Sequence, residues 1–154
     1  MKTLVLGLGN SILSDDGVGL YIARELKNFL NREEITIAEA CLGGLGLLDL
    51  MVGYDKVIII DAIQTKEGKV GQIYRLKSKE FNATRHASSI HSVNFTTALE
   101  LGHQLELAMP QQIVIFAIEV VDISTFSEEC TPEVQKAIPK CVEMVLQEIN
   151  QTNR

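Results

Sequence analysis

Apolar residues recur along the chain in two alternating patterns, one typical of strands and one typical of helices. Short apolar runs predict strands at residues 3–7, 35–40, 57–61 and 112–118. Apolar positions three and four apart predict helices at residues 16–30 and 93–105, a shorter helix at 47–51, and a long helix that begins near 131. The run at 57–60 is apolar without interruption, which is typical of a parallel sheet covered on both faces.

This alternation predicts an α/β fold, a three-layer α/β/α sandwich around a mostly parallel, twisted sheet. One strand is expected to be antiparallel, because residues 70–76 alternate apolar and polar positions like a hairpin partner after a turn at 66–68. The last helix opens with an N-cap residue and a proline at its first position, Thr131 and Pro132. Pro139 lies inside this helix and is expected to kink it or to mark a one-turn break.

Length and composition limit the class of protein. The chain has 154 residues, which fits one domain over 1–154, and its formal net charge is −6 with no basic run. Nucleic acids and anionic membranes are therefore poor partners, and the longest apolar run is far too short for a membrane helix. The three cysteines are widely spaced without a CxxC pair, so neither a disulfide framework nor a structural zinc site is expected. A cytoplasmic protein is the simplest interpretation, and no secretory signal is recognised.

A glycine loop between the first strand and the first helix carries two adjacent carboxylates, Asp15 and Asp16. The N-terminus of a helix normally attracts anions such as phosphate. A phosphate 4–5 Å from these aspartates would meet repulsion of roughly 4 kcal/mol per charge pair, whereas a cation would be attracted by a similar amount. The loop also has Ile12 where a dinucleotide fingerprint requires its third glycine. The sequence therefore indicates a metal or amine site on a scaffold of nucleotide-binding type.

Two further polar features fall at the same end of the predicted sheet, where open α/β sheets bind their ligands. Asp61 follows the apolar run 57–60, and the polar stretch 82–91, which contains His86 and His91, precedes a helix. Two carboxylates and an imidazole suit a divalent transition metal with open coordination positions. The sequence lacks HExxH, GxSxG and Walker motifs, and no histidine is placed along the chain to activate Ser11 or Ser14.

Every candidate side chain also has a purely structural interpretation. One of the two aspartates is expected to cap the following helix, and Asp61 could be a turn former or a cap. His91 could be a helix-start residue that binds no ligand, and His86 could be an exposed loop residue. His103 could interact with the C-terminal dipole of a helix. Glu39, at the end of the second strand, would hold a ribose in a dinucleotide-binding protein.

At these residues the chain resembles a known family, the hydrogenase maturation endopeptidases. The resemblance runs over nearly the whole chain and rests mainly on the long N-terminal motif GLGNSILSDDGVG. It is supported by IIIDAI around Asp61, by His91 ahead of a helix, and by CTPEV at the start of the last helix. Proteins of this family remove a short C-terminal extension from the large-subunit precursor of nickel–iron hydrogenases after nickel has been inserted.

The resemblance implies that Asp16, Asp61 and His91 are metal ligands that recognise nickel presented by the precursor. Nickel would then arrive with the substrate, and other divalent cations could occupy the same ligands. The catalytic residues stay unassigned, with Asp16 and Asp61 as candidates, because a metal can polarise the scissile carbonyl or activate water. Two other functions remain open at this point: a Rossmann-like module that binds a nucleotide or cofactor, and a chaperone that binds the precursor without cleaving it.

Overall fold

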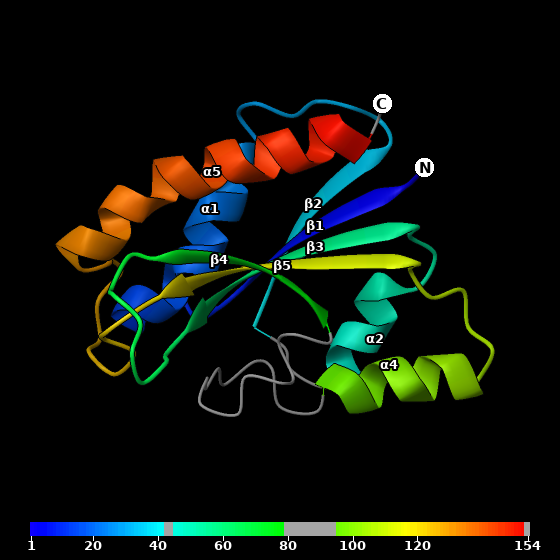
Figure 1. The fold of residues 1–154 in the computed structure, drawn as a ribbon, viewed down its shortest axis with the longest axis horizontal. Helices are drawn as coiled ribbons and strands as arrows, with labels where there is room; N and C mark the ends of the chain where they lie inside the picture. Colours follow the sequence, from blue (N-terminus) through cyan, green and yellow to red (C-terminus); the bar gives the residue numbers. More distant parts are fainter. Residues whose placement is uncertain (42–44, 79–94, 153–154) are drawn as a thin grey trace.

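A five-stranded sheet runs through the middle of the computed structural model, which describes residues 1–41, 45–78 and 95–152 (Figure 1). The strands are β1 (Thr3–Leu8), β2 (Ile35–Ala40), β3 (Lys56–Ile63), β4 (Ile73–Lys77) and β5 (Gln112–Glu119). The helices are the 3₁₀ turn η1 (Ser14–Gly17), α1 (Val18–Leu26), α2 (Leu45–Met51), α4 (Phe95–Gln104) and α5 (Pro132–Thr152).

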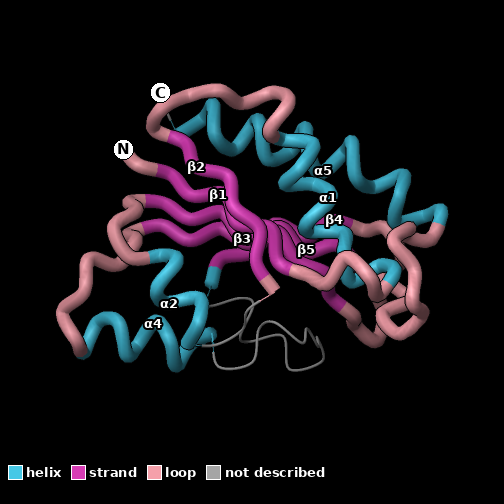
Figure 2. The backbone as a smooth tube through the Cα atoms, turned by 180° about the vertical axis from the view of Figure 1, so that it is seen from behind, coloured by secondary structure: helices cyan, strands magenta, loops and turns pink. Residues whose placement is uncertain are grey.

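The helices cover both faces of this sheet, whose strand order is β2-β1-β3-β5-β4. Helices α1 and α5 lie on one face, and α2 and α4 lie on the other (Figures 1 and 2). Strands β1, β2, β3 and β5 are parallel, and β4 is antiparallel to β5. The predicted three-layer α/β/α sandwich with one antiparallel strand is therefore confirmed.

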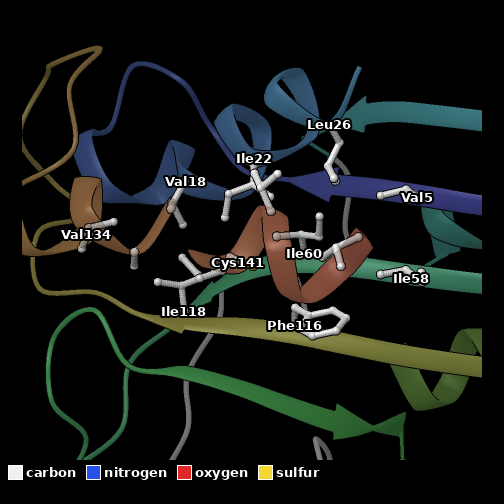
Figure 3. Packing of buried hydrophobic residues seen from close by; sticks show 14 of the residues in the cluster. Val5, Val18, Ile22, Leu26, Ile58, Ile60, Phe116, Ile118, Val134 and Cys141 are labelled. Atoms are coloured by element: carbon white, nitrogen blue, oxygen red, sulfur yellow. The ribbon is translucent and has the colours of Figure 1, made fainter. Parts of the chain in front are cut away.

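The core is split by the sheet into two layers, because successive residues of a strand point to opposite faces. Ile58 and Ile60 of β3 pack with Ile22 of α1 and Cys141 of α5 (Figure 3). Val57, Ile59 and Ile63 of the same strand pack on the side of α2 and α4. Each fully buried isoleucine contributes roughly 1.5–3 kcal/mol relative to an exposed one. A strand buried on both faces explains the uninterrupted apolar run in the sequence.

Helix α5 is tied to the sheet by buried charges at the amino end of the parallel strands. The Glu148 carboxylate accepts a hydrogen bond from Arg75 Nε at 3.1 Å and lies 3.8 Å from Lys56 Nζ. Burial lowers the pKa of Lys56, and the attraction of Glu148 acts against that change. This cluster fixes the last turns of α5 over β3 and β4.

Four predictions about the elements require correction. Helix α1 covers Val18–Leu26 and not 16–30, because its first turn is the separate 3₁₀ turn η1. Strand β3 extends to Ile63, so Asp61 lies inside the strand and not after it. Strand β4 pairs with β5 and not in a hairpin with β3, because β1 and β5 already occupy both sides of β3. Helix α5 continues through Pro139, so of the two predicted outcomes, a kink or a one-turn break, the break is wrong.

Two glycines let α1 approach the sheet closely at the carboxyl end of β1 and β3. A Cβ atom on Gly19 would lie 2.4 Å from the carbonyl oxygens of both Leu8 and Ile60. A Cβ atom on Gly7 would lie 2.4 Å from the carbonyl oxygen of Gly19. The backbone of α1 thus packs directly against two strands, and this contact places η1 at the carboxyl end of the sheet.

Among the described residues, no helix is both long and apolar enough to cross a membrane.

The close approach at Gly19 predicts a large loss of stability on substitution by alanine. We expect Gly19→Ala to lower the free energy of unfolding by about 3 kcal/mol, because the added methyl group overlaps two backbone carbonyls. Gly53→Ala is the matched control, since Gly53 has φ +92° and open space around its Cβ position. It should lose only about 1 kcal/mol from backbone strain. Urea unfolding measures both values, and equal losses would contradict the steric argument.

Candidate functional site

Two nearly buried aspartates lie on neighbouring segments at the carboxyl end of the sheet. Asp16 belongs to η1 and Asp61 to β3, and each side chain is 2% exposed. The turn η1 packs directly against β3. Asp61 follows the same alternation as Ile59 and Ile63, so it faces the side of the sheet that α2 and α4 cover. The structure therefore brings together the two segments that carry the predicted carboxylates.

Backbone hydrogen bonds orient one oxygen of each carboxylate. Asp16 Oδ2 accepts a hydrogen bond from the Asn10 amide at 3.0 Å. Asp61 Oδ1 accepts one from the Ala62 amide at 2.8 Å. These bonds orient the two carboxylates, and a carboxylate oxygen is also a ligand for hard and borderline cations. A pair of such carboxylates is a donor set for a cation.

Asp15 has a different role, because its carboxylate joins η1 to the residues after β5 and to the residue before α5. It accepts hydrogen bonds from the backbone amides of Val121 at 3.2 Å, Asp122 at 3.0 Å and Thr131 at 2.7 Å. The Thr131 hydroxyl donates to it as well, at 3.0 Å. The Asp15 side chain is fully buried and anchors the start of α5 beside η1.

The expectation that one of the two aspartates caps the first helix is wrong. In this described part of the chain, Leu13 and Gly17 are the N-cap residues of η1 and α1, and neither makes a side-chain cap hydrogen bond. The aspartates lie inside the 3₁₀ turn, past the cap position. The Asp16 carboxylate instead accepts a hydrogen bond from the Asn10 amide. The Asp15 carboxylate accepts from the amides of the segment after β5.

The loop around the aspartates is held rigidly against residues 127–129. Ser14 adopts φ 48°, a left-handed conformation that costs roughly 1–2 kcal/mol for a residue with a side chain. Its amide donates to the Ser127 carbonyl at 2.9 Å, and its hydroxyl donates to the Glu129 carbonyl at 3.0 Å. The Tyr21 hydroxyl lies 3.0 Å from the Ser11 carbonyl oxygen and 2.5 Å from that of Glu128. These bonds offset the strain and make the two loops one unit.

The other predicted residues divide into described and undescribed ones. His86 and His91 fall in 79–94, outside the described residues. His103 lies in the last turn of α4, as its structural interpretation expected. Glu39 lies 2.9 Å from an Arg24 nitrogen and 3.4 Å from Lys27 Nζ, and the hydrogen bond from Arg24 holds the pKa of that carboxyl below its usual value. Glu39 is thus a surface ion-pair partner.

A fourth buried carboxylate at this end of the sheet, Glu119, escaped the sequence analysis as a site residue. Glu119, the last residue of β5, accepts hydrogen bonds from the Thr65 amide at 2.8 Å and its hydroxyl at 2.5 Å. The Tyr74 hydroxyl donates to it at 2.9 Å, and burial raises the pKa of Tyr74. Glu119 therefore anchors the connection between β3 and β4. The signal that could have identified Glu119 is a charged residue at the end of an apolar strand.

Within residues 1–41, 45–78 and 95–152, no three His, Cys, Asp or Glu side chains form a group that could hold a metal ion. Asp16 and Asp61 supply two oxygen ligands, and the third predicted ligand, His91, is outside these ranges. A pocket of about 600 Å³ lies instead at the amino end of the sheet near Lys2, Glu34 and Tyr54. It contains neither aspartate, so buried carboxylate chemistry, and not pocket size, identifies the candidate site.

Two of the three cysteines are buried and protonated. Burial raises the pKa of the Cys130 and Cys141 thiols to about 12, so both are protonated at neutral pH. Cys41 is exposed, and all three thiols are free. Cys130 and Cys141 are thus buried residues of the core.

The fold agrees with comparisons to known proteins. The model of the family described as hydrogenase maturation protease matches residues 20–148. The chain belongs to the hydrogenase maturation protease family. It is therefore a peptidase of the hydrolase class. The matched range contains Asp61 and His91, and Asp16 lies four residues before it.

Individual relatives and solved structures support the same family. Protein FrxA of Pyrococcus furiosus is 31% identical over 140 residues, which are 87% of this chain and 95% of FrxA. The hydrogenase 2 maturation protease of Escherichia coli is 33% identical over 84 residues, which are 54% of this chain and 51% of that protein.

Two solved structures show how far the fold is shared. The hydrogenase maturating endopeptidase HybD from Escherichia coli superposes with a TM-score of 0.87 at 25% identity, covering 99% of this chain and 94% of HybD. HybD from Thermococcus kodakarensis gives a TM-score of 0.73 at 25% identity, with 96% and 98% covered.

The hydrogen bonds of Asp15 predict that a neutral isostere destabilises the fold. We expect Asp15→Asn to lower the free energy of unfolding by roughly 3 kcal/mol, because the amide group replaces an acceptor with a donor that faces other donors. The thermal midpoint should fall by roughly 10 °C. Asp49→Asn, at an exposed position on α2, is the matched control and should change stability by less than about 0.5 kcal/mol. A loss below 1 kcal/mol for Asp15→Asn would refute the anchoring role.

Thiol accessibility gives a second prediction for this region. At pH 8 we expect Cys41 to react rapidly with a disulfide reagent, while Cys130 and Cys141 react only after unfolding in urea. Cys41→Ser should therefore abolish the fast phase of labelling. Rapid labelling of all three thiols in the native protein would contradict the burial of Cys141 in α5 and of Cys130 just before it.

Proposed function

We propose that this protein removes the C-terminal extension of a nickel–iron hydrogenase large-subunit precursor after nickel has been inserted. Family membership supports the processing of a hydrogenase precursor. The observation that carries the finer proposal is the pair of buried carboxylates, Asp16 and Asp61, on segments in direct contact. They would recognise nickel together with the imidazole of His91.

Electrostatics favours a cation between these carboxylates. Two neighbouring negative charges that are shielded from water repel each other. A divalent cation relieves the repulsion. Because the nickel belongs to the precursor, only a metal-loaded precursor gains this interaction. The difference in binding would therefore discriminate loaded from unloaded substrate.

The placement of α4 supports His91 as the third ligand. This helix covers the sheet face to which Asp61 belongs, and Leu99 of α4 packs against that layer. In the sequence, His91 comes four residues before Phe95, where α4 begins. A set of two oxygen ligands and one imidazole nitrogen suits nickel and also other divalent first-row ions such as Zn²⁺.

The hydrolytic step would use groups at the same place. Bound metal can polarise the scissile carbonyl or lower the pKa of water, and Asp16 or Asp61 could act as a general base toward that water. We also propose that residues 1–154 act as one domain, in the cytoplasm, with the precursor and not nucleic acid or membrane as partner. The three free thiols agree with a reducing compartment.

Substitution of the three proposed ligands tests this function. We expect Asp16→Asn, Asp61→Asn and His91→Ala each to lower the rate of trimming of nickel-loaded precursor by at least about 100-fold, because each removes a metal ligand. Mass spectrometry of the precursor measures the loss of the C-terminal peptide. Wild-type protein should leave nickel-free precursor at its full mass.

His103→Ala is the matched control, since His103 lies in the last turn of α4 and should trim at the wild-type rate. Urea unfolding of each variant separates loss of function from loss of fold. Normal trimming by all three ligand variants would refute the assignment of the site. Binding of the precursor without any change in its mass would instead support a chaperone, and saturable nucleotide binding would support a Rossmann-like module.

A further inference from the structure

Three large apolar side chains are exposed on the loops that surround the buried aspartates. Ile12 is 48% exposed, Val121 57% and Phe126 83%. Ile12 precedes η1, and the other two lie between β5 and α5. We call these three residues the Phe126 patch. Single exposed apolar residues are common on protein surfaces, but a group on one small region marks an interaction site.

Hydrogen bonds place two members of the patch, Ile12 and Phe126, on adjacent bridged segments, and hold the third, Val121, to the turn η1. The Ser127 amide donates to the Ile12 carbonyl at 2.9 Å, and the Ser14 amide donates to the Ser127 carbonyl at 2.9 Å. Leu13 and Ser127 therefore form a parallel bridge. Ile12 and Phe126 each precede a bridged residue, so they are neighbours that project to the same side. The Val121 amide binds Asp15 Oδ2 further along the same segment.

The exposure of the patch is built into a rigid surface. Ser14, Asp15 and Tyr21 together bind the backbone of residues 11, 121–122 and 127–131, so the loops that carry the patch are anchored at several points. A partner that covers these side chains pays little to order them, because the loops are already fixed. Such preorganised apolar groups are typical anchors of protein interfaces.

Charge around the patch specifies the partner's chemistry. Neither segment 9–23 nor segment 121–135 contains a lysine or arginine. Both carry carboxylates, and four of these surround Phe126 in the sequence: Asp122, Glu128, Glu129 and Glu133. A complementary partner segment therefore combines apolar side chains with lysine or arginine.

We propose that the Phe126 patch docks a basic, apolar-containing segment of the hydrogenase large-subunit precursor and so delivers the scissile region to Asp16. The inference rests on the proposed function, which supplies the precursor as the occupant. Asp16 lies on the same hydrogen-bonded loop, four residues after Ile12, so a segment bound at the patch is adjacent to the candidate site.

Steady-state trimming of nickel-loaded precursor by the full-length protein tests this docking. We expect Phe126→Ser to raise KM roughly tenfold with kcat within about twofold of wild type, because the patch contributes binding and not chemistry. Ile12→Ser should raise KM in the same direction. Glu129→Lys should raise KM at low salt, with the effect fading at high salt as the charges are screened.

Phe29→Ser is the matched control, since Phe29 is 60% exposed just after α1, at the amino end of the sheet. It should leave KM unchanged. Urea unfolding confirms that each variant is folded. Equal KM values for Phe126→Ser, Ile12→Ser and wild type would overturn the proposal.

Binding measurements separate failure of the docking surface from failure of the proposed function. If wild-type protein trims no precursor, the proposed function fails, and affinity for immobilised precursor then decides the docking. Weaker binding by Phe126→Ser than by Phe29→Ser would support the patch, and equal binding would overturn it. Sedimentation tests another occupant: a wild-type dimer that Phe126→Ser converts to a monomer would assign the patch to a second copy of this chain.

Discussion

One buried carboxylate holds the carboxyl end of the sheet together. Asp15 is fully buried, and it accepts hydrogen bonds from backbone amides at both ends of the segment that connects β5 to α5. Charge-assisted hydrogen bonds of this kind are among the stronger ones in proteins, and leaving a buried charge without them is costly. Because Asp16 is the next residue along the chain, the same bonds that anchor α5 also fix the position of a candidate metal ligand.

The two neighbouring aspartates therefore have different partners. Asp15 is saturated by donors from distant segments, whereas Asp16 accepts from Asn10 beside the strand that carries Asp61. The glycines beneath α1 make this arrangement possible, since only glycine at position 19 lets the helix reach the carbonyls of β1 and β3. Backbone packing positions the site, and side-chain hydrogen bonds orient it.

Sequence periodicity predicted most of the fold because apolar burial on both faces of the sheet dictates that pattern. It failed where tertiary contacts decide: the pairing of β4 depends on which strands already flank β3, and the position of Asp61 depends on where β5 ends. The separate role of Asp15 could not be predicted either, because its partners lie more than 100 residues away. The role of Glu119 could not be predicted for the same reason, since Thr65 and Tyr74 contact it only in the folded chain.

The anchoring of Asp15 also sets an order of events during synthesis. A growing chain that has emerged only as far as β3 contains Asp16 and Asp61, yet it has none of the amide donors that Asp15 requires from residues 121–131. Domains generally form as units once their sequence is complete. The loop that carries Asp15 and Asp16 can thus reach its final arrangement only after the start of α5 has left the ribosome.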